Sequence, residues 1–211
     1  MLMEENRRFY SFEGIDYSGK STQIKLLKEY LEQQGHQVYV LREPGGTDIS
    51  EKIREVLLDN KNHNMSDFCE IFLYSAARTQ LVSEKIIPLL EKGYFVLADR
   101  YVDSTTAYQG YGRGIDEKLV RQINIAATLG LMPSTTFLMN MEPDVFYKRS
   151  KKAAASADRL EDSGKDFFER VYRGYLEIAQ SEPERYTVLD ATAPKDKVHQ
   201  QIVEIVKSKE I

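Results

Sequence analysis

The stretch Gly14-Ile-Asp-Tyr-Ser-Gly19-Lys20-Ser21 decides the fold of this chain of 211 residues. It fits the pattern G-x-x-x-x-G-K-[S/T], whose glycines let consecutive backbone N–H groups turn inward around phosphate oxygens. A short apolar run precedes it at residues 9–13, and apolar residues recur at helical spacing after it, over residues 21–34. A strand, a glycine-rich turn and a helix in this order predict a phosphate-binding loop, or P-loop.

The residue types of the loop predict its chemistry. Lys20 offers a positive charge to the β and γ phosphates of a nucleotide, and the Ser21 hydroxyl is a ligand for Mg²⁺. The N-terminus of the following helix adds a dipole that favours anions. We expect the nucleotide to contact the loop and the first helical turn, which comprise Gly14, Ile15, Asp16, Tyr17, Ser18, Gly19, Lys20, Ser21 and Thr22.

Strands and helices alternate along the rest of the chain. Strands are expected at residues 9–13, 37–41, 94–98, 135–139 and 186–189, and helices at 21–34, 49–58, 65–90, 118–129, 167–179 and 198–206, with a short helix from Pro143. The strands are continuous apolar runs, which is typical of a parallel sheet covered on both faces. The long helix is expected to be kinked near Pro88. We therefore predict an α/β domain of three layers, with helices on both faces of the sheet.

The composition narrows the class of protein. A net charge of −4 gives no basic field that would collect nucleic acid. No apolar run approaches the ~18 residues of a membrane span, and the charged residues 1–8 do not fit a signal peptide. The one cysteine, Cys69, excludes a disulfide framework and a multi-cysteine metal site, and we expect it to be a small buried apolar residue. These features favour a single cytoplasmic domain over residues 1–211, with no nucleic-acid or membrane partner.

A P-loop alone leaves the activity open, because switches, motors and small-molecule kinases all use one. A GTP switch needs a guanine-reading sequence of the N-K-x-D kind, and Asn60-Lys61-Asn62-His63 has a histidine where the aspartate belongs. An ATPase motor needs more chain than remains. A kinase needs a second ligand site, so that site is the next feature to seek.

Three further segments offer polar residues suited to a second ligand. Arg42-Glu43-Pro44-Gly45-Gly46 follows the second strand, at the edge where α/β sheets bind ligands. Tyr74 and Arg78 lie four residues apart, so they share a helix face on which a ring and a guanidinium could meet a base. Asp99-Arg100 follows the third strand, where a P-loop protein holds magnesium and the acceptor phosphate. The polar, glycine-rich run at residues 103–114 is expected to lie outside the core.

These segments together resemble thymidylate kinases. The motifs occur in the family's order, as Phe12-Glu13-Gly14, Arg42-Glu-Pro-Gly-Gly46, the Tyr74/Arg78 pair, Asp99-Arg100-Tyr101, Ala107-Tyr-Gln-Gly110 with Arg113-Gly114, and Asp158-Arg159-Leu160-Glu161. The resemblance covers about residues 9–200. It implies transfer of the γ-phosphoryl group of ATP to dTMP, giving dTDP, with Mg²⁺ as cofactor and a homodimer as the assembly. It also implies the P-loop NTPase fold, with a parallel sheet of strand order 2-3-1-4-5.

The resemblance implies a role for each matching residue. The thymine base is expected to meet one aromatic ring and three hydrogen-bonding side chains, those of Tyr74, Arg78, Thr105 and Gln109. The dTMP phosphate is expected among three guanidiniums, those of Arg42, Arg54 and Arg100. The deoxyribose is expected near Glu43 and Tyr108, and Mg²⁺ near Ser21 and Asp99. The remaining acid of the P-loop, Asp16, is expected near the metal or the acceptor phosphate.

The segment 148–165 is expected to be a mobile, surface-borne lid over the ATP phosphates. Animal and yeast thymidylate kinases carry an arginine after the P-loop acid, whereas this chain has Tyr17 there, so positive charge must come from elsewhere. The candidate lid cations are Arg149, Lys151, Lys152 and Arg159. The expected catalytic set is Lys20, Asp16, Arg100 and Arg159. Two alternatives stay open, another nucleotide or deoxynucleoside kinase on the same fold and a non-catalytic nucleotide-binding switch.

Overall fold

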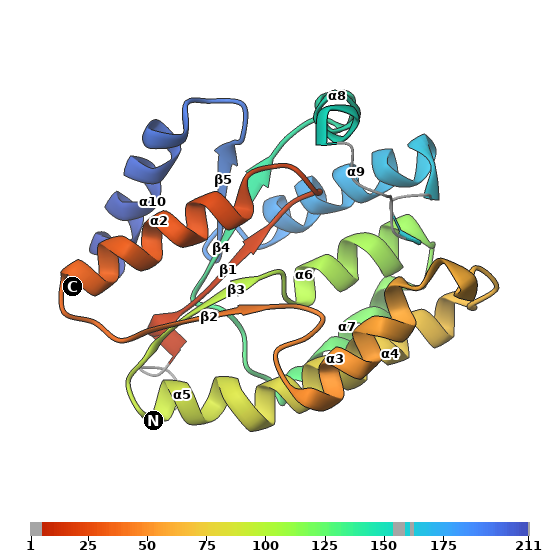
Figure 1. Ribbon diagram of the computed structural model, residues 1–211, viewed down its shortest axis with the longest axis horizontal. Coiled ribbons are helices and arrows are strands. Elements are labelled where there is room, and N and C mark those ends of the chain that lie inside the picture. The colour runs from red at the N-terminus through yellow and green to blue at the C-terminus, as the bar shows by residue number, and fades with distance from the viewer. Residues whose placement is uncertain (1–5, 154–158, 161–162, 211) are drawn as a thin grey trace.

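A five-stranded parallel sheet forms the centre of the computed structural model, which describes residues 6–153, 159–160 and 163–210 (Figure 1). The strands are β1 (Phe9–Glu13), β2 (Val38–Arg42), β3 (Phe95–Asp99), β4 (Thr135–Asn140) and β5 (Tyr186–Asp190). Their order is β2-β3-β1-β4-β5, and every pair of neighbours runs parallel. The predicted fold class and strand order are therefore confirmed, and each predicted strand end lies within one residue of the observed one.

Helices cover both faces of the sheet (Figure 1). They are α2 (Lys20–Gln33), α3 (Asp48–Leu58), α4 (Asp67–Leu81), α5 (Ile87–Glu91), α6 (Val102–Thr105), α7 (Glu117–Thr128), α8 (Pro143–Ala153), α9 (Lys165–Ser181) and α10 (Lys195–Glu210). Successive β1 side chains point to opposite faces. Tyr10 packs in one cluster with Leu27 of α2 and Ile202 of α10, whereas Phe9 packs in another with Leu81 of α4. The apolar residues of β1 are thus buried on both sides, which explains why its sequence is continuously apolar.

The register of the sheet brings the polar segments to one edge. β3 lies between β1 and β2, and Asp99 at its end pairs with Phe12 on one side and with Arg42 on the other. All three strands run in the same direction, so the P-loop after β1 and the loops after β2 and β3 open at the same carboxyl edge. The topology alone therefore gathers segments that lie far apart in the sequence.

The run at residues 103–114 is the clearest error of the sequence prediction, because most of it is buried. It forms α6 and a π-helical turn, Thr106–Gly112, that packs against α9. Gly112 allows this close approach, since a Cβ there would lie 2.6 Å from the Phe167 ring. The polar side chains of the run are buried together with Ala107, and several of them turn toward the cavity described below.

The irregularity expected near Pro88 is present, and one smaller prediction needs correction. The long helix over residues 65–90 is interrupted by a π-helical turn, Val82–Ile86, immediately before α5, which holds Pro88. Proline has no N–H and its ring crowds the carbonyl four residues earlier, so the helix widens one turn ahead of it. Cys69 is exposed, not buried, because it lies on the outer side of α4 beside Phe68.

Within the described residue ranges, no helix has the length and apolar character needed to cross a membrane.

Candidate active site

A cavity of about 510 Å³ opens at the carboxyl edge of the sheet, where the P-loop faces the loops after β2 and β3. Walls also come from α3, α4, the buried π-helical turn and the segment that follows α8. The site residues predicted from the sequence that line this cavity are Asp16, Tyr17, Gly19, Lys20, Ser21, Thr22, Arg42, Glu43, Arg54, Tyr74, Arg78, Asp99, Arg100, Thr105, Tyr108 and Gln109. All nine residues expected to contact dTMP thus share one cavity with the P-loop lysine.

The P-loop has the backbone geometry that its sequence predicts. Gly14 has a φ of +127°, and a Cβ there would lie 2.6 Å from the Met139 carbonyl oxygen, so no other residue fits without a shift. Helix α2 begins at Lys20, whose Nζ donates to the carbonyls of Gly14 at 3.0 Å and Ile15 at 3.1 Å. Burial, with the nearby Arg100 charge adding to it, lowers the pKa of Lys20 to about 8. The lysine is thus held inside the loop, with the Asp16 carboxylate 4.0 Å away.

Two oxygen-bearing side chains lie together where a divalent cation is expected. The Ser21 hydroxyl donates to Asp99 Oδ2 at 2.9 Å, across the gap between the start of α2 and the end of β3. Hydroxyl and carboxylate oxygens are hard ligands of the kind that Mg²⁺ prefers, and Mg²⁺ needs few protein ligands because it keeps waters and binds substrate phosphates. The donor set therefore fits magnesium bound together with a nucleotide.

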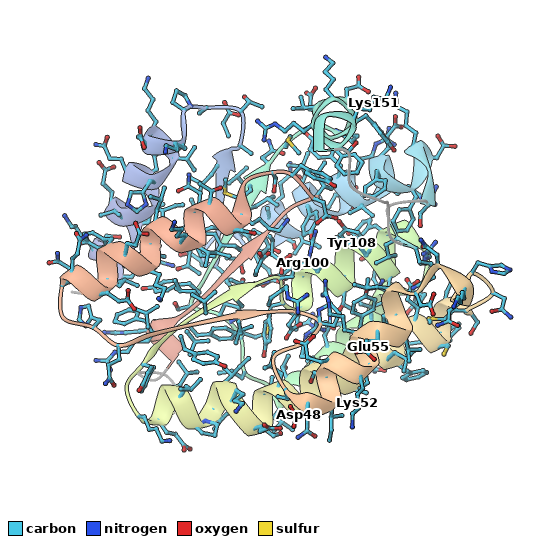
Figure 2. The ribbon with its side chains drawn as sticks, in the orientation of Figure 1. Asp48, Lys52, Glu55, Arg100, Tyr108 and Lys151 are labelled. Carbon is cyan, nitrogen blue, oxygen red and sulfur yellow. The ribbon has the colours of Figure 1, made fainter. Side chains whose placement is uncertain are left out.

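Arg100 is the most heavily bonded cation of the cavity. Its φ of +74° turns the side chain back toward the P-loop, a conformation that non-glycine residues rarely adopt. One terminal nitrogen donates to Asp16 Oδ1 at 2.6 Å, and the other donates to the Gly14 carbonyl at 3.0 Å and to Ser104 Oγ at 3.1 Å. Its guanidinium also lies 5.2 Å from the centre of the Tyr108 ring, and Figure 2 shows the two side chains in the interior of the molecule. Arg100 therefore links Ser104, in the helix after β3, to the P-loop.

The charge of Arg100 controls its acidic neighbour. Burial raises the pKa of Asp16, but the charges of Arg100 and Lys20 outweigh it, so the pKa lies below its usual value. Asp16 is consequently ionised at neutral pH. The floor of the cavity thus carries one carboxylate held between two cations.

Arg78 and Glu43, which both line the cavity, form a buried ion pair. Arg78 Nε donates to Glu43 Oε2 at 2.7 Å, and Nη1 donates to Thr105 Oγ1 at 2.9 Å. Nη2 donates to the Tyr101 carbonyl at 3.0 Å, and the Arg78 side chain is only 2% exposed. The guanidinium is fixed from three elements, so its position does not depend on a ligand.

Two further arginines line the mouth of the cavity. Arg42 pairs with Glu51 of α3 at 3.2 Å, and Glu51 also accepts from the backbone N–H of Gly46 at 2.8 Å. Arg54 donates to the Pro44 carbonyl at 2.9 Å. The loop after β2 and the first turns of α3 are therefore tied together by the same side chains that face the cavity.

The lid candidates divide into two groups. Arg149 donates to the carbonyls of Tyr17 at 2.9 Å and Ala191 at 3.1 Å and lines the cavity, whereas Lys151 is exposed and points outward from α8 (Figure 2). Arg159 is not among the residues that line the cavity. Its Nε donates to the Leu57 carbonyl at 2.9 Å and its side chain is 8% exposed, so this part of the segment is not surface-borne. The side chain of Lys152, and Asp158 and Glu161 of the motif, lie outside the described residues.

The sequence prediction differs from the structure in two ways: some predicted residues do not line the cavity, and some supporting residues were missed. Among the loop residues expected at the nucleotide, the side chain of Ile15 belongs to the core, and Gly14 and Ser18 do not line the cavity. The missed residues are three acids and a tyrosine that bond to cavity side chains or to their supports, namely Glu51, Glu70, Glu13 and Tyr175. Of these only Glu13 lay within a recognised motif, and the others carry no local signal.

Glu13 supports Arg100 from behind the P-loop. The fully buried carboxylate accepts from the Tyr101 N–H at 2.7 Å, from Ser104 Oγ at 2.6 Å and from the Tyr175 hydroxyl at 3.0 Å. Ser104 and Tyr175 in turn accept from Arg100. Burial, and then the charge of Asp103, raises the pKa of Glu13 to about 7.

The raised pKa of Glu13 predicts a pH-dependent stability. Below pH 4.5 both the folded and the unfolded chain hold the proton, whereas between pH 4.5 and about 7 only the unfolded chain releases it, so stability falls as pH rises. Glu13→Gln should lack this loss, and its stability relative to wild type should grow by a few kcal/mol at most across the window. Denaturant unfolding of both proteins at pH 5, 6, 7 and 8 measures the difference. A difference that is flat with pH would contradict the shift.

Comparisons with known proteins identify the family of this chain. A family model described as thymidylate kinase matches residues 12–202. The thymidylate kinase of Thermoanaerobacter sp. (strain X514) is 46% identical over 200 residues, covering 95% of this chain and 97% of its own. That of Kosmotoga olearia is 46% identical over 195 residues, covering 92% and 93%. The crystal structure of thymidylate kinase from Ehrlichia chaffeensis superposes with a TM-score of 0.77 at 31% identity, covering 94% and 97%. This chain belongs to the thymidylate kinase family.

Proposed function

We propose that this protein transfers the γ-phosphoryl group of ATP to dTMP, giving dTDP and ADP and so serving dTTP synthesis. One observation carries the proposal: a single cavity holds the P-loop cation Lys20 together with the residues of a second, arginine-rich ligand site. A switch needs no second site of this kind, and its guanine-reading motif is absent from residues 60–63. Family membership supports the same activity.

Phosphoryl transfer needs two nucleotides held in line and negative charge neutralised, with little covalent chemistry from the protein. Lys20 and the inward N–H groups of the P-loop bind the β and γ phosphates of ATP. Bound Mg²⁺, held through Ser21 and Asp99, supplies charge neutralisation on the phosphates. Arg100, with Asp16 beside it, holds the acceptor phosphate next to the loop. The buried supports of Arg100 fix its position before the substrates arrive.

The acceptor lies along the wall from Arg42 to Gln109. Arg42 and Arg54 bind its phosphate with Arg100, and the ring of Tyr74 stacks on the base. The deoxyribose packs against Tyr108, near Glu43. Arg78 and Thr105, which are bonded to each other at 2.9 Å, form the base-reading end together with Gln109. Side chains that are fixed by protein contacts lose little entropy on binding, which favours affinity.

A coupled assay with ATP, Mg²⁺ and a panel of nucleoside monophosphates and nucleosides tests the proposal. Clear turnover of dTMP, above that of dUMP, dCMP, dGMP, dAMP and thymidine, is the expected result. A preference for another acceptor would identify a different kinase on the same fold. An absence of turnover with every acceptor, together with tight ATP binding, would favour the non-catalytic switch.

The segment 148–165 acts as a lid in this proposal, with Arg159 as its catalytic contact. Arg149 joins the segment to the P-loop, and Arg159 holds it on the acceptor side through the Leu57 carbonyl. Closure over both substrates excludes water and limits ATP hydrolysis.

Arg159→Ala is therefore expected to lower kcat by about a hundredfold while changing the KM for dTMP by less than about threefold. Steady-state kinetics with varied dTMP measure both parameters. Lys148→Ala, at an exposed position of α8, is the matched control. An unchanged kcat would remove Arg159 from the mechanism.

A homodimer and a cytoplasmic location complete the proposal. Helix α4 packs beside α3 and α7, and these helices leave large apolar side chains uncovered, including Phe68 at 52%, Phe72 at 56% and Ile125 at 52% exposed. Uncovered apolar side chains on adjacent helices favour a contact with a second copy. Sedimentation should give a dimer for the wild type and a monomer for Phe72→Glu. A dimer that survives this substitution would place the contact elsewhere.

A further inference from the structure

Glu70 is a buried acid that bonds to a cavity residue but does not itself line the cavity. It lies in the first turn of α4 and is 1% exposed. Arg113 donates to both of its oxygens, at 3.1 Å each, and Arg159 lies 2.7 Å from Oε2. Gln109 Nε2 donates to Oε1 at 2.9 Å. One carboxylate thus joins a predicted base-reading residue to two arginines.

The two guanidiniums keep Glu70 ionised. Burial opposes ionisation, but the hydrogen bonds from Arg113 and Gln109 and the charges of both arginines outweigh it, so the pKa of Glu70 lies below its usual value. An ionised carboxylate has no proton to donate and only accepts hydrogen bonds. The end of the Gln109 amide that faces Glu70 must therefore be the NH₂ group. The oxygen and the nitrogen of a glutamine amide have similar shapes, so the orientation is assigned from the hydrogen-bond partners. Here the carboxylate of Glu70 decides it.

The carbonyl end of Gln109 consequently faces away from Glu70. Gln109 lines the cavity, and within the described parts of the chain no donor is bonded to its Oε1. Some polar side-chain atoms of those residues are fully buried and have no hydrogen-bond partner, and Gln109 Oε1 is not one of them. The cavity therefore presents a hydrogen-bond acceptor at this position.

An acceptor at this position discriminates between pyrimidine bases. Thymine and uracil carry N–H at ring position 3, which can donate to a carbonyl oxygen, whereas cytosine has a bare nitrogen lone pair there. A site built to accept a hydrogen bond rejects a ligand that cannot donate, because both groups are then buried unpaired.

We propose that Glu70 is a positioning residue for specificity: by fixing the amide of Gln109, it makes the site select a nucleoside monophosphate whose pyrimidine ring carries N–H over one that does not. This inference rests on the proposed base site between Tyr74 and Gln109. It assigns no contact between Glu70 and substrate. Arg159 shares the same carboxylate, so the lid and the base-reading side chain are held by one group.

Glu70→Gln tests the proposal. A neutral amide at this position can donate to Gln109 Oε1, which frees the Gln109 side chain to turn its NH₂ group toward the cavity. The kcat/KM for dTMP should then fall and that for dCMP should rise, lowering the dTMP:dCMP ratio at least tenfold. A weakened contact with Arg159 affects both acceptors alike and cancels in this ratio. Thermal unfolding confirms that the variant is folded.

Arg113→Gln is the matched control, because it also removes charge from the cluster but leaves the bond between Glu70 and Gln109. Its ratio should stay within about threefold of wild type. An unchanged ratio in folded Glu70→Gln, or an equal change in both variants, would overturn the positioning role. The dTMP turnover of the wild type is a separate measurement, so a failure of the proposed function is distinguishable.

A second measurement needs no variant and covers the case in which Glu70→Gln fails to fold. The monophosphate of N3-methylthymidine carries a methyl group in place of the hydrogen on ring position 3, so it is bulkier there and cannot donate. The wild type should turn it over with a kcat/KM at least a hundredfold below that for dTMP. Equal kcat/KM values for the two ligands would overturn the proposal, because no acceptor would then face ring position 3.

Discussion

Lys20→Ala is expected to lower kcat by about a thousandfold, which corresponds to roughly 4 kcal/mol of lost transition-state stabilisation. Negative charge on the transferred group and the leaving phosphate is stabilised by groups that are already in place. Lys20 is such a group, because two carbonyls of the loop hold its Nζ at 3.0 and 3.1 Å. Alanine removes this charge together with the two hydrogen bonds to the loop.

The pH dependence of ATP binding checks the same assignment. Burial, and then the Arg100 charge, lowers the pKa of Lys20 to about 8 in the protein without nucleotide, and bound phosphates favour the charged form. Above pH 8 ATP binding must therefore take up a proton, so the KM for ATP should rise with pH in the wild type and stay flatter in Lys20→Ala. Lys25→Ala, on the exposed side of the same helix, is the control. A kcat within tenfold of wild type for Lys20→Ala would contradict the assignment.

The fold was predictable because its signals are local. Strands buried on both faces are continuous apolar runs. The loop after β1, Gly14 to Ser21, has a backbone conformation that few other sequences can adopt. The positions of Arg42 and Asp99 at one edge then follow from topology, since both end neighbouring parallel strands. Sequence reasoning is reliable where a single segment carries the whole constraint.

The supports of the site could not be predicted because their partners are distant in sequence. Glu70 lies in the first turn of an amphipathic helix, where an acid is ordinary, and its partners Gln109 and Arg113 follow 39 and 43 residues later. The same applies to Cys69, since a helix with apolar residues on two faces does not reveal which face is buried. Residues 103–114 misled for a different reason: their glycines permit close packing against α9, although the composition is that of a loop.

Among the residues proposed to bind dTMP, Arg100 is the one whose replacement should lower kcat/KM for dTMP most. It is charged and forked, and it donates to Asp16, Ser104 and a P-loop carbonyl at once. Lysine keeps the charge but offers a single ammonium in place of the planar fork, so it cannot make the same set of bonds. Arg100→Lys should therefore lose about a hundredfold in kcat/KM for dTMP, and Arg100→Ala about a thousandfold or more.

The Arg100 variants also separate catalysis from stability. Removing the guanidinium leaves the hydroxyls of Ser104, Tyr108 and Tyr175 with fewer partners, which should lower the free energy of unfolding by about 1–3 kcal/mol. Such a loss leaves most molecules folded at 25 °C, so kinetics there report the site itself. Arg173→Ala, exposed on α9, controls for loss of an arginine in general. If Arg100→Lys kept the wild-type kcat/KM for dTMP, charge alone would account for its role, and the forked geometry that links Asp16 to the acceptor wall would be unnecessary.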